Sequence, residues 1–378
     1  MRKVVDFCKK EIVLVAAFVL AVISCFFVKP SLAYIDYIDW RVLGILLALM
    51  IIMEGLKENG LFASIGNALL KKTKKVWQLC AVLVFLCFFL GMFITNDVAL
   101  ITFVPFAIYV LKQSHKEELA AFIIVLQTLA ANLGSMLTPI GNPQNLYLYQ
   151  LGGYTMGEFL KVMLPVTVAS GVMLILCLFF IPGKMQKLEQ ENISRNNKDF
   201  TKKEKRNIGV YLVLFVLALS VVLRLIPYYI VLGIVVLLVL ILERKILKQV
   251  DYCLLLTFIC FFIFIGNLGN LPVFKETLEG LVTGRELLAG VISSQVVSNV
   301  PASLLLSSFT TDYNALLTGV NLGGLGTLIA SMASLISYKQ FANTYNTEKG
   351  KYFRLFTGLS LLFLAVLLVL AKIQGYSL

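Results

Sequence analysis

Long apolar runs separated by short polar loops make up almost the whole chain. The uninterrupted runs approach the length of about 20 residues that a helix needs to cross a bilayer, and they cover residues 12–28, 40–56, 159–181, 208–226, 228–242, 252–266 and 352–371. Other apolar stretches contain polar residues, glycine or proline near their middle, at 76–112, 119–150, 286–310 and 314–340. The pattern predicts an all-α polytopic membrane protein with broken segments inside the membrane.

Two of the broken stretches are interrupted by a short group of polar side chains. The first contains Thr95-Asn96-Asp97, and the second contains Ser298-Asn299. Irregular backbone at membrane depth is tolerated only where it is buried in protein or lines a cavity. A carboxylate such as Asp97 is also costly inside a membrane and is therefore a functional candidate by default. Both interruptions are expected to be the tips of helical hairpins and candidate binding sites.

The charge distribution predicts how the chain crosses the membrane. Only 14% of the residues are charged, against about 25% in a soluble domain. The net charge of +12 comes from a few basic loops, of which residues 183–207 hold eight Lys and Arg against four acids. The positive-inside rule places these loops and the N-terminus in the cytoplasm of a multi-pass protein of the cell (inner or plasma) membrane. All basic loops reach that side only if 76–112 and 286–310 are re-entrant hairpins.

The two halves of the chain resemble each other. Residues 132–140 (NLGSMLTPI) match residues 321–329 (NLGGLGTLI) without gaps, with Asn, Leu, Gly, Thr and Ile at identical spacing. The two hairpin tips also correspond, and Ile38-Asp39-Trp40 resembles Val250-Asp251-Tyr252 at the start of an apolar run. Because the first helices of the halves cross in opposite directions in the predicted topology, the repeats are expected to be inverted. Such repeats with corresponding interruptions are typical of secondary transporters.

The repeat predicts the organisation of the chain. Residues 1–182 form the first inverted repeat, with a re-entrant hairpin at 76–112 and a broken helix at 119–150; residues 183–207 form a cytoplasmic basic linker; and residues 208–378 form the second repeat, with a hairpin at 286–310 and a broken helix at 314–340.

The four interruptions supply the candidate substrate- and ion-binding residues, which are Thr95, Asn96, Asp97, Asn132, Thr138, Gly141, Asn142, Gln144, Asn145, Ser298, Asn299, Asn321, Gly326, Thr327 and Ser331. The carbonyl ends of broken helices and the side-chain oxygens suit Na⁺, with Asn96, Asp97, Thr138, Asn142, Ser298, Asn299 and Thr327 as candidate ligands, whereas the amide ends suit an anion. No Lys or Arg lies in these segments, so an anion is expected to be held by amides and hydroxyls. Ser, Thr and Asn also serve as packing contacts between membrane helices, and this alternative stays open for each segment alone.

Several other kinds of site are not expected. The seven cysteines form no CxxC pair, and the one histidine, His115, lies in a charged loop. The chain therefore predicts neither a metal centre nor a cofactor beyond a coupling Na⁺ or H⁺, and it predicts no enzyme or nucleic-acid-binding protein. A channel would need a continuous polar pore rather than paired breaks. Glu54 and Arg224 lie near the ends of apolar runs and are expected to reach the membrane interface.

The four interrupted segments resemble a known family. The stretches TNDVALITFVPF, NLGSMLTPIGNPQNLYLY, SNVPASLL and NLGGLGTLIASMASL are similar to the ion transporter superfamily, which includes divalent anion:sodium symporters, arsenite efflux permeases, sodium/proton antiporters and citrate-transporter-like domains. The resemblance covers essentially the whole chain. It implies a homodimer with a scaffold, a moving transport part and elevator-type alternating access.

The hairpin tips differ between branches of that superfamily. In the symporters both tips read Ser-Asn-Thr, whereas Asp97 follows Asn96 here and Val300 follows Asn299; Asn-Asp is more similar to the arsenite permease and antiporter branch. The first hypothesis is therefore a secondary active transporter for a small anion, an oxyanion or a carboxylate, coupled to Na⁺ or H⁺. The second is a sodium/proton antiporter with Asp97 as the exchanged carboxylate.

Overall fold

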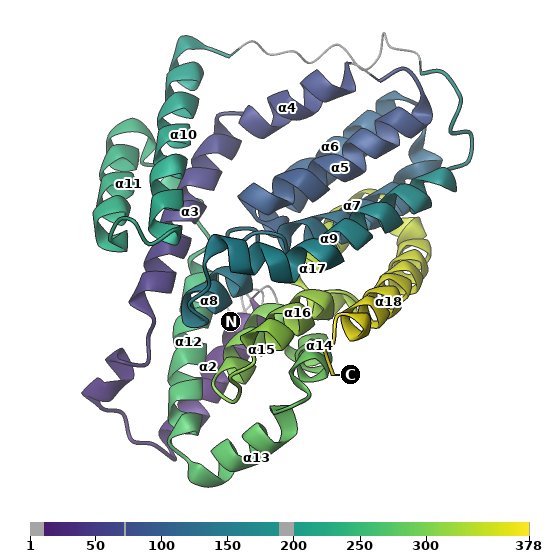
Figure 1. The fold of residues 1–378 in the computed structure, drawn as a ribbon. Helices are drawn as coiled ribbons and strands as arrows, with labels where there is room; N and C mark the ends of the chain where they lie inside the picture. Colours follow the sequence, from purple (N-terminus) through teal and green to yellow (C-terminus); the bar gives the residue numbers. More distant parts are fainter. Residues whose placement is uncertain (1–10, 72, 189–199, 378) are drawn as a thin grey trace.

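The computed structural model describes residues 11–71, 73–188 and 200–377, and these are almost entirely helical (Figure 1). Within these ranges the one extended pairing is an isolated bridge between Lys75 and Lys187. Six of the described helices are long and apolar enough to cross a membrane, at Val76–Ile94, Glu117–Ser135, Met156–Phe179, Lys202–Val222, Tyr252–Gly269 and Asn346–Ile373. The prediction of an all-α polytopic membrane protein is confirmed.

One side of the molecule consists of long helices around α3 and α12 (Figure 1). These are α2 (Ile12–Cys25), α3 (Trp40–Glu58), α10 (Lys202–Val222), α11 (Tyr228–Glu243) and α12 (Tyr252–Gly269). Helix α2 precedes α3 in the chain but packs on α12, while α11 precedes α12 and packs on α3. The two halves therefore exchange helices reciprocally on this side.

Helices α3 and α12 begin with the same cap. Asp39 accepts a hydrogen bond from the amide of Val42 at 2.9 Å, and Asp251 accepts one from the amide of Leu254 at 3.2 Å. The backbone angles also agree, with φ −79° and ψ 87° at Asp39 and φ −78° and ψ 82° at Asp251. An aspartate at this position satisfies amides that the first helical turn leaves unpaired.

The two helices also end alike. Asn59 and Asn270 each donate from Nδ2 to the carbonyl of a glycine four residues earlier, Gly55 and Gly266, at 2.9 Å in both cases. An aromatic ring, from Tyr211 over Gly55 and from Tyr37 over Gly266, occupies the space that a Cβ would need. These matching ends support the predicted internal repeat.

The stretches predicted as hairpins each contain two helices separated by a single residue. Helices α5 (Val76–Ile94) and α6 (Asn96–Gln113) meet at Thr95 and pack on each other (Figure 1), and α14 (Glu286–Val297) and α15 (Asn299–Ser307) meet in the same way at Ser298. Their position relative to a bilayer stays a prediction.

The stretches predicted as broken helices are also divided. Helices α7 (Ala120–Ser135) and α8 (Pro143–Leu151) are separated by a loop with Pro139 and Gly141, and α16 (Tyr313–Gly323) and α17 (Met332–Thr344) by a glycine-containing loop. Helix α7 packs on α5, and α16 packs on α14, through glycines that allow close approach: a Cβ at Gly134 would overlap the Phe88 carbonyl oxygen, and one at Gly319 would overlap that of Leu287.

The remaining elements connect these parts. They are α4 (Leu61–Leu70), α9 (Met156–Phe179), α13 (Pro272–Val282), α18 (Lys349–Ile373) and short 3₁₀ helices at Leu32–Ile35, Glu117–Leu119, Ile246–Lys248, Leu328–Ala330 and Asn346–Glu348. Helices α4 and α13, of 10 and 11 residues, follow α3 and α12 and were not predicted. They are too short for the length criterion of a membrane span.

The predicted linker 183–207 is helical at its end. Helix α10 begins at Lys202 because Thr201 and Glu204 cap it reciprocally, with the Thr201 amide 2.8 Å from Glu204 Oε2 and the Glu204 amide 3.2 Å from Thr201 Oγ1. The Thr-x-x-Glu spacing is a recognisable sequence signal for a helix start. At the other end, the carbonyls of Lys184 and Gln186 accept the first amides of α5. Residues 189–199 lie outside the described ranges.

Candidate functional site

The two hairpin tips have the same unusual backbone conformation. Thr95 has φ 68° and ψ 150°, and Ser298 has φ 74° and ψ 156°. This region is essentially restricted to glycine, and another residue there costs about 1–3 kcal/mol. Such strain persists only where the surroundings hold the chain, so each tip is fixed by its neighbours.

The loop between α7 and α8 holds the first tip. Thr138 donates its hydroxyl to the carbonyl of Met92, and the amide of Asn96 donates to the carbonyl of Gly141 at 3.2 Å. Gly141 lies so close to Ser135 that a Cβ would overlap the Ser135 carbonyl oxygen. Glycine is therefore required where the broken helix meets the tip.

The loop between α16 and α17 holds the second tip in a corresponding way. The Thr327 hydroxyl lies 3.5 Å from the carbonyl of Gln295, as the Thr138 hydroxyl contacts that of Met92. In each case the carbonyl belongs to the residue three positions before the tip. Ser298 donates to the carbonyl of Ala330 at 3.3 Å. Gln295 also donates to the carbonyls of Gly323 and Leu325, at 2.8 and 2.9 Å.

Side-chain amides join the two halves at their centre. Asn132 donates to Ser334 Oγ at 3.1 Å and accepts from Asn96 at 2.9 Å and from Ser331 at 3.0 Å. In the other direction, Asn321 donates to Asn145 Oδ1 at 2.7 Å. The helix before the break in each half is therefore hydrogen-bonded to the helix after the break in the other half: α7 to α17, and α16 to α8.

Several buried polar atoms near these breaks have no hydrogen-bond partner among the described residues. They are Asp97 Oδ1, Asn142 Oδ1, Asn321 Oδ1 and both polar atoms of the Gln144 side chain. Asn142 is 3% exposed and Gln144 is fully buried. Because buried polar groups are nearly always paired, these unpaired atoms are candidates for contacts to a bound ligand.

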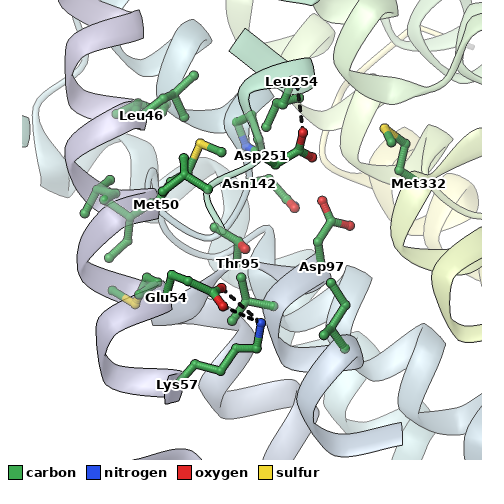
Figure 2. A pocket seen from close by; sticks show the side chains of 18 of the residues that line it. Leu46, Met50, Glu54, Lys57, Thr95, Asp97, Asn142, Asp251, Leu254 and Met332 are labelled. Carbon is green, nitrogen blue, oxygen red and sulfur yellow. Dashed lines mark hydrogen bonds and ion pairs between the residues drawn. The ribbon is translucent and has the colours of Figure 1, made fainter. Parts of the chain in front are cut away.

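A cavity of about 190 Å³ lies between the first tip and the helices around α3 (Figure 2). Thr95, Asp97 and Asn142 line it from the tip side, and Asp251 lines it from the start of α12. Glu54 and Lys57 line its α3 wall. The carboxylates of Asp97 and Asp251 and the side chain of Asn142 point into the same space (Figure 2).

The charges of this cavity do not balance. Glu54 binds Lys57 in two contacts of 2.8 and 3.0 Å, so this pair is neutral. Asp97 and Asp251 are the other charged residues that line the cavity. The cavity also receives the N-terminal ends of α6 and α8, whose dipoles favour negative charge. It therefore combines oxygen ligands for a cation with helix ends that suit an anion.

The structure divides the predicted site residues into groups. Thr95, Asp97 and Asn142 line the cavity, while Asn96, Asn132, Asn145, Asn321 and Ser331 form the central hydrogen-bond network. Thr138 and Gly141 contact the first tip. Ser298 is the second tip, and Thr327 contacts the helix that leads to it. Gly326, with φ 100°, lies beside Gln295. Asn299 is buried beside Gly324, and Gln144 is buried without a partner. The second tip does not line the cavity of the first.

Sequence reasoning missed Asp251, Lys57, Gln295 and Ser334. In the sequence, Asp251 was recognised only as the counterpart of Asp39. The repeat aligns these two residues but does not indicate that Asp251 faces Asp97. Ser334 occupies the position in the second half that Asn145 occupies in the first, counted from the matched asparagines. This equal spacing from the matched asparagines is the sequence signal that could have identified Ser334.

Glu54 and Arg224 make polar contacts within the protein, and the expectation that they reach the membrane interface stays a prediction. Glu54 lines the cavity in an ion pair with Lys57, with 14% of its side chain exposed. Arg224 has a positive φ of 61° and donates to the carbonyls of Tyr149, Gln150 and Gly153, at 3.3–3.4 Å. A cation at a helix C-terminus satisfies unpaired carbonyls, so Arg224 caps α8.

The chain is similar in sequence to several known transporters and membrane proteins. The chain is 31% identical over 340 residues to an uncharacterized transporter of Methanocaldococcus jannaschii, covering 89% of this chain and 90% of the relative. It is 32% identical over 307 residues to the inner membrane protein YbiR of Escherichia coli, covering 80% of each. A silicon efflux transporter of Oryza sativa subsp. japonica is 33% identical over 149 residues, or 38% of this chain and 30% of the relative.

A family model also matches most of the chain. The model described as citrate transporter matches residues 5–315, a range that includes both hairpin tips and the first broken helix. The relatives are named as transporters or membrane proteins, and the helices described above are long and apolar enough for a membrane. The chain is a membrane transporter that belongs to the citrate transporter family.

Proposed function

We propose that the protein is a secondary active transporter that moves a small anion, an oxyanion or a carboxylate, coupled to Na⁺ or H⁺. The observation that carries this proposal is the cavity at the first tip. There, unpartnered oxygens of Asp97 and Asn142 lie beside the N-terminal ends of α6 and α8. Oxygen ligands suit a hard cation, and helix N-termini suit an anion. No other cofactor is required.

The cavity charge provides a physical reason for coupling. Asp97 and Asp251 repel an anion as long as both are ionised and unneutralised, since like charges in a region of low dielectric interact strongly. A bound cation neutralises one of the two charges and so weakens that repulsion. The anion is therefore expected to bind well only after the cation, which makes transport of the anion alone unfavourable.

The proposed transport cycle follows from the two groups of helices. The hairpins and broken helices move as the transport part relative to a scaffold that contains α3, α10, α11 and α12, as elevator-type alternating access requires. The cavity lies beside the end of α3 and the basic segment before α12. With basic loops and the N-terminus in the cytoplasm, the conformation described here faces inward. We further propose a homodimer in the cell membrane, with two inverted repeats at 1–182 and 208–378.

A reconstituted system tests the proposal. Purified protein in proteoliposomes is given an inward Na⁺ gradient, a pH gradient or neither. Uptake is measured for the anions sulfate, citrate and succinate, and for arsenite and silicic acid, which are mostly uncharged near neutral pH. Gradient-dependent uptake of at least one anion is the expected result. An uptake rate that is the same with and without either gradient, or no uptake of any anion, would contradict secondary active anion transport.

The second candidate is a sodium/proton antiporter with Asp97 as the exchanged carboxylate. The excess of negative charge in the cavity favours it, because a site for cations alone needs no anion-binding group. In the same vesicles, loaded with a pH-sensitive dye, an antiporter moves protons when Na⁺ is added without any anion. If the dye signal does not change when Na⁺ is added, and anion uptake depends on a gradient, this candidate is excluded.

A further inference from the structure

Asp251 occupies an unexpected position for a residue that caps a helix. Its Oδ1 accepts the amide of Leu254 at 3.2 Å, as Asp39 does for Val42 at the start of α3. Its Oδ2 accepts no hydrogen bond from any described residue and is free to reach the cavity. The side chain points toward the carboxylate of Asp97 across the cavity (Figure 2).

The opposing residue is also incompletely satisfied. Asp97 Oδ1 is buried and has no partner among the described residues. Asn142 lines the same cavity; it is 3% exposed, and its Oδ1 also has no partner among the described residues. Its Nδ2 donates to Ser135 Oγ at 2.6 Å, and this bond fixes which end of the amide faces the cavity. The side-chain oxygens therefore come from three separate elements.

Two ionised carboxylates facing each other are unfavourable without a counter-charge. The other charged side chains of the cavity are Glu54 and Lys57 on α3, and Lys57 is already bound by Glu54 at 2.8 Å. Neither α6 nor α12 supplies a basic residue to the cavity lining. A monovalent cation held by oxygen ligands neutralises one of these two negative charges.

We infer that Asp251 is a ligand of the coupling cation, shared with Asp97 and Asn142, when the transport part is in the position described here. This inference rests on the proposed function and deepens it. Helix α6 packs on α5, α7 and α17, whereas α12 packs mainly on α2 and α15. The complete set of ligands therefore joins the hairpin to the α3–α12 side of the molecule, and relative movement of these parts takes Asp251 away from the cation.

Cation binding to the purified protein tests the inference without any transport. Na⁺ is titrated by calorimetry into protein in detergent, with choline chloride keeping the ionic strength constant. Asp251→Asn is expected to weaken Na⁺ binding by at least about tenfold, since even residues that only orient a metal ligand contribute about 10–100-fold. Asn remains a strong helix cap, so folding is preserved; Asp251→Ser is a second variant with the same property.

The chain offers a matched control in Asp39→Asn, which changes the same cap in the other half and lies outside the cavity lining. It is expected to bind Na⁺ as the wild type does. Asp97→Asn and the Asp97→Asn/Asp251→Asn pair complete a double-mutant cycle. If both residues bind one cation, the double variant loses much less affinity than the product of the two single losses.

The inference is overturned by wild-type Na⁺ affinity in Asp251→Asn, by an equal loss in Asp39→Asn, or by independent effects of Asp97 and Asp251. Absence of Na⁺ binding to the wild type would overturn it as well. Failure of anion uptake in vesicles, by contrast, contradicts the proposed function while leaving the measured Na⁺ site in place. The two failures are therefore distinguishable.

Discussion

Asn132 donates its side-chain amide to Ser334 at 3.1 Å and so ties the end of α7 to the start of α17. The same side chain accepts hydrogen bonds from Asn96 and Ser331 through its oxygen. One residue thus connects the first hairpin tip, its own broken helix and the broken helix of the other half. The candidate site is built around this buried connection, and its removal should be costly.

Asn132→Ala is expected to lower the free energy of unfolding by several kcal/mol. It leaves three buried polar groups without this partner, and each such group costs about 1–3 kcal/mol. Thermal unfolding in detergent measures the loss. The control is Thr167→Ala, because the buried Thr167 hydroxyl donates to the Met163 carbonyl in its own helix. A loss no larger than that of the control would contradict the central role of Asn132.

Substitution at either tip should remove transport. Asn96→Ala and Asn299→Ala each delete a buried amide next to a strained residue, and uptake in proteoliposomes is expected to fall to background. Amounts in the membrane and elution in size-exclusion chromatography should stay near the wild type. If both variants retained transport, the assignment of the two tips to the site would be refuted.

Gly141→Ala should prevent the first tip from closing. The added Cβ overlaps the Ser135 carbonyl oxygen, so the loop between α7 and α8 must move and the Gly141 carbonyl is displaced from the Asn96 amide. Gly209→Ala is the control: Gly209 is exposed in α10 with no atom near its Cβ position, and it should gain up to about 1 kcal/mol. Equal unfolding temperatures for the two variants would disprove the close contact.

Substitution of Glu54 and substitution of Lys57 should change the affinity for the anion in opposite directions. Glu54→Gln frees a positive charge in the cavity and is expected to lower the KM for the anion about fivefold, the equivalent of about 1 kcal/mol for a partly exposed charge. Lys57→Gln leaves Glu54 unpaired and should raise the KM by a similar factor. The double variant is expected to return close to the wild type. Changes of the same sign in both single variants would rule out this electrostatic role.

Local signals predicted much of the fold. Thr95-Asn96-Asp97 and Ser298-Asn299 stand out inside apolar runs, and the helix ends fall at those residues. Proline and glycine likewise marked the loop before α8. These features depend on residues adjacent in the chain, whose effect on the backbone is direct.

Features that depend on tertiary packing could not be predicted in the same way. Asp97 and Asp251 come from different halves, and no periodicity brings them to one cavity. The ion pair of Glu54 and Lys57 is a local i,i+3 contact, yet its place on the cavity wall depends on how α3 lies against the first tip. Helices α4 and α13 were missed because length and hydrophobicity identify only segments that cross the membrane.

The reciprocal packing of α2 on α12 and of α11 on α3 interlocks the two halves. A fragment that ended after α9 would leave α2 without α12 and α3 without α10 and α11. Its apolar faces would then have only lipid to contact, and Asn59 would lose its partners Glu243 and Asn207. The halves are similar in design, but they form a single folding unit, and neither half is expected to assemble alone.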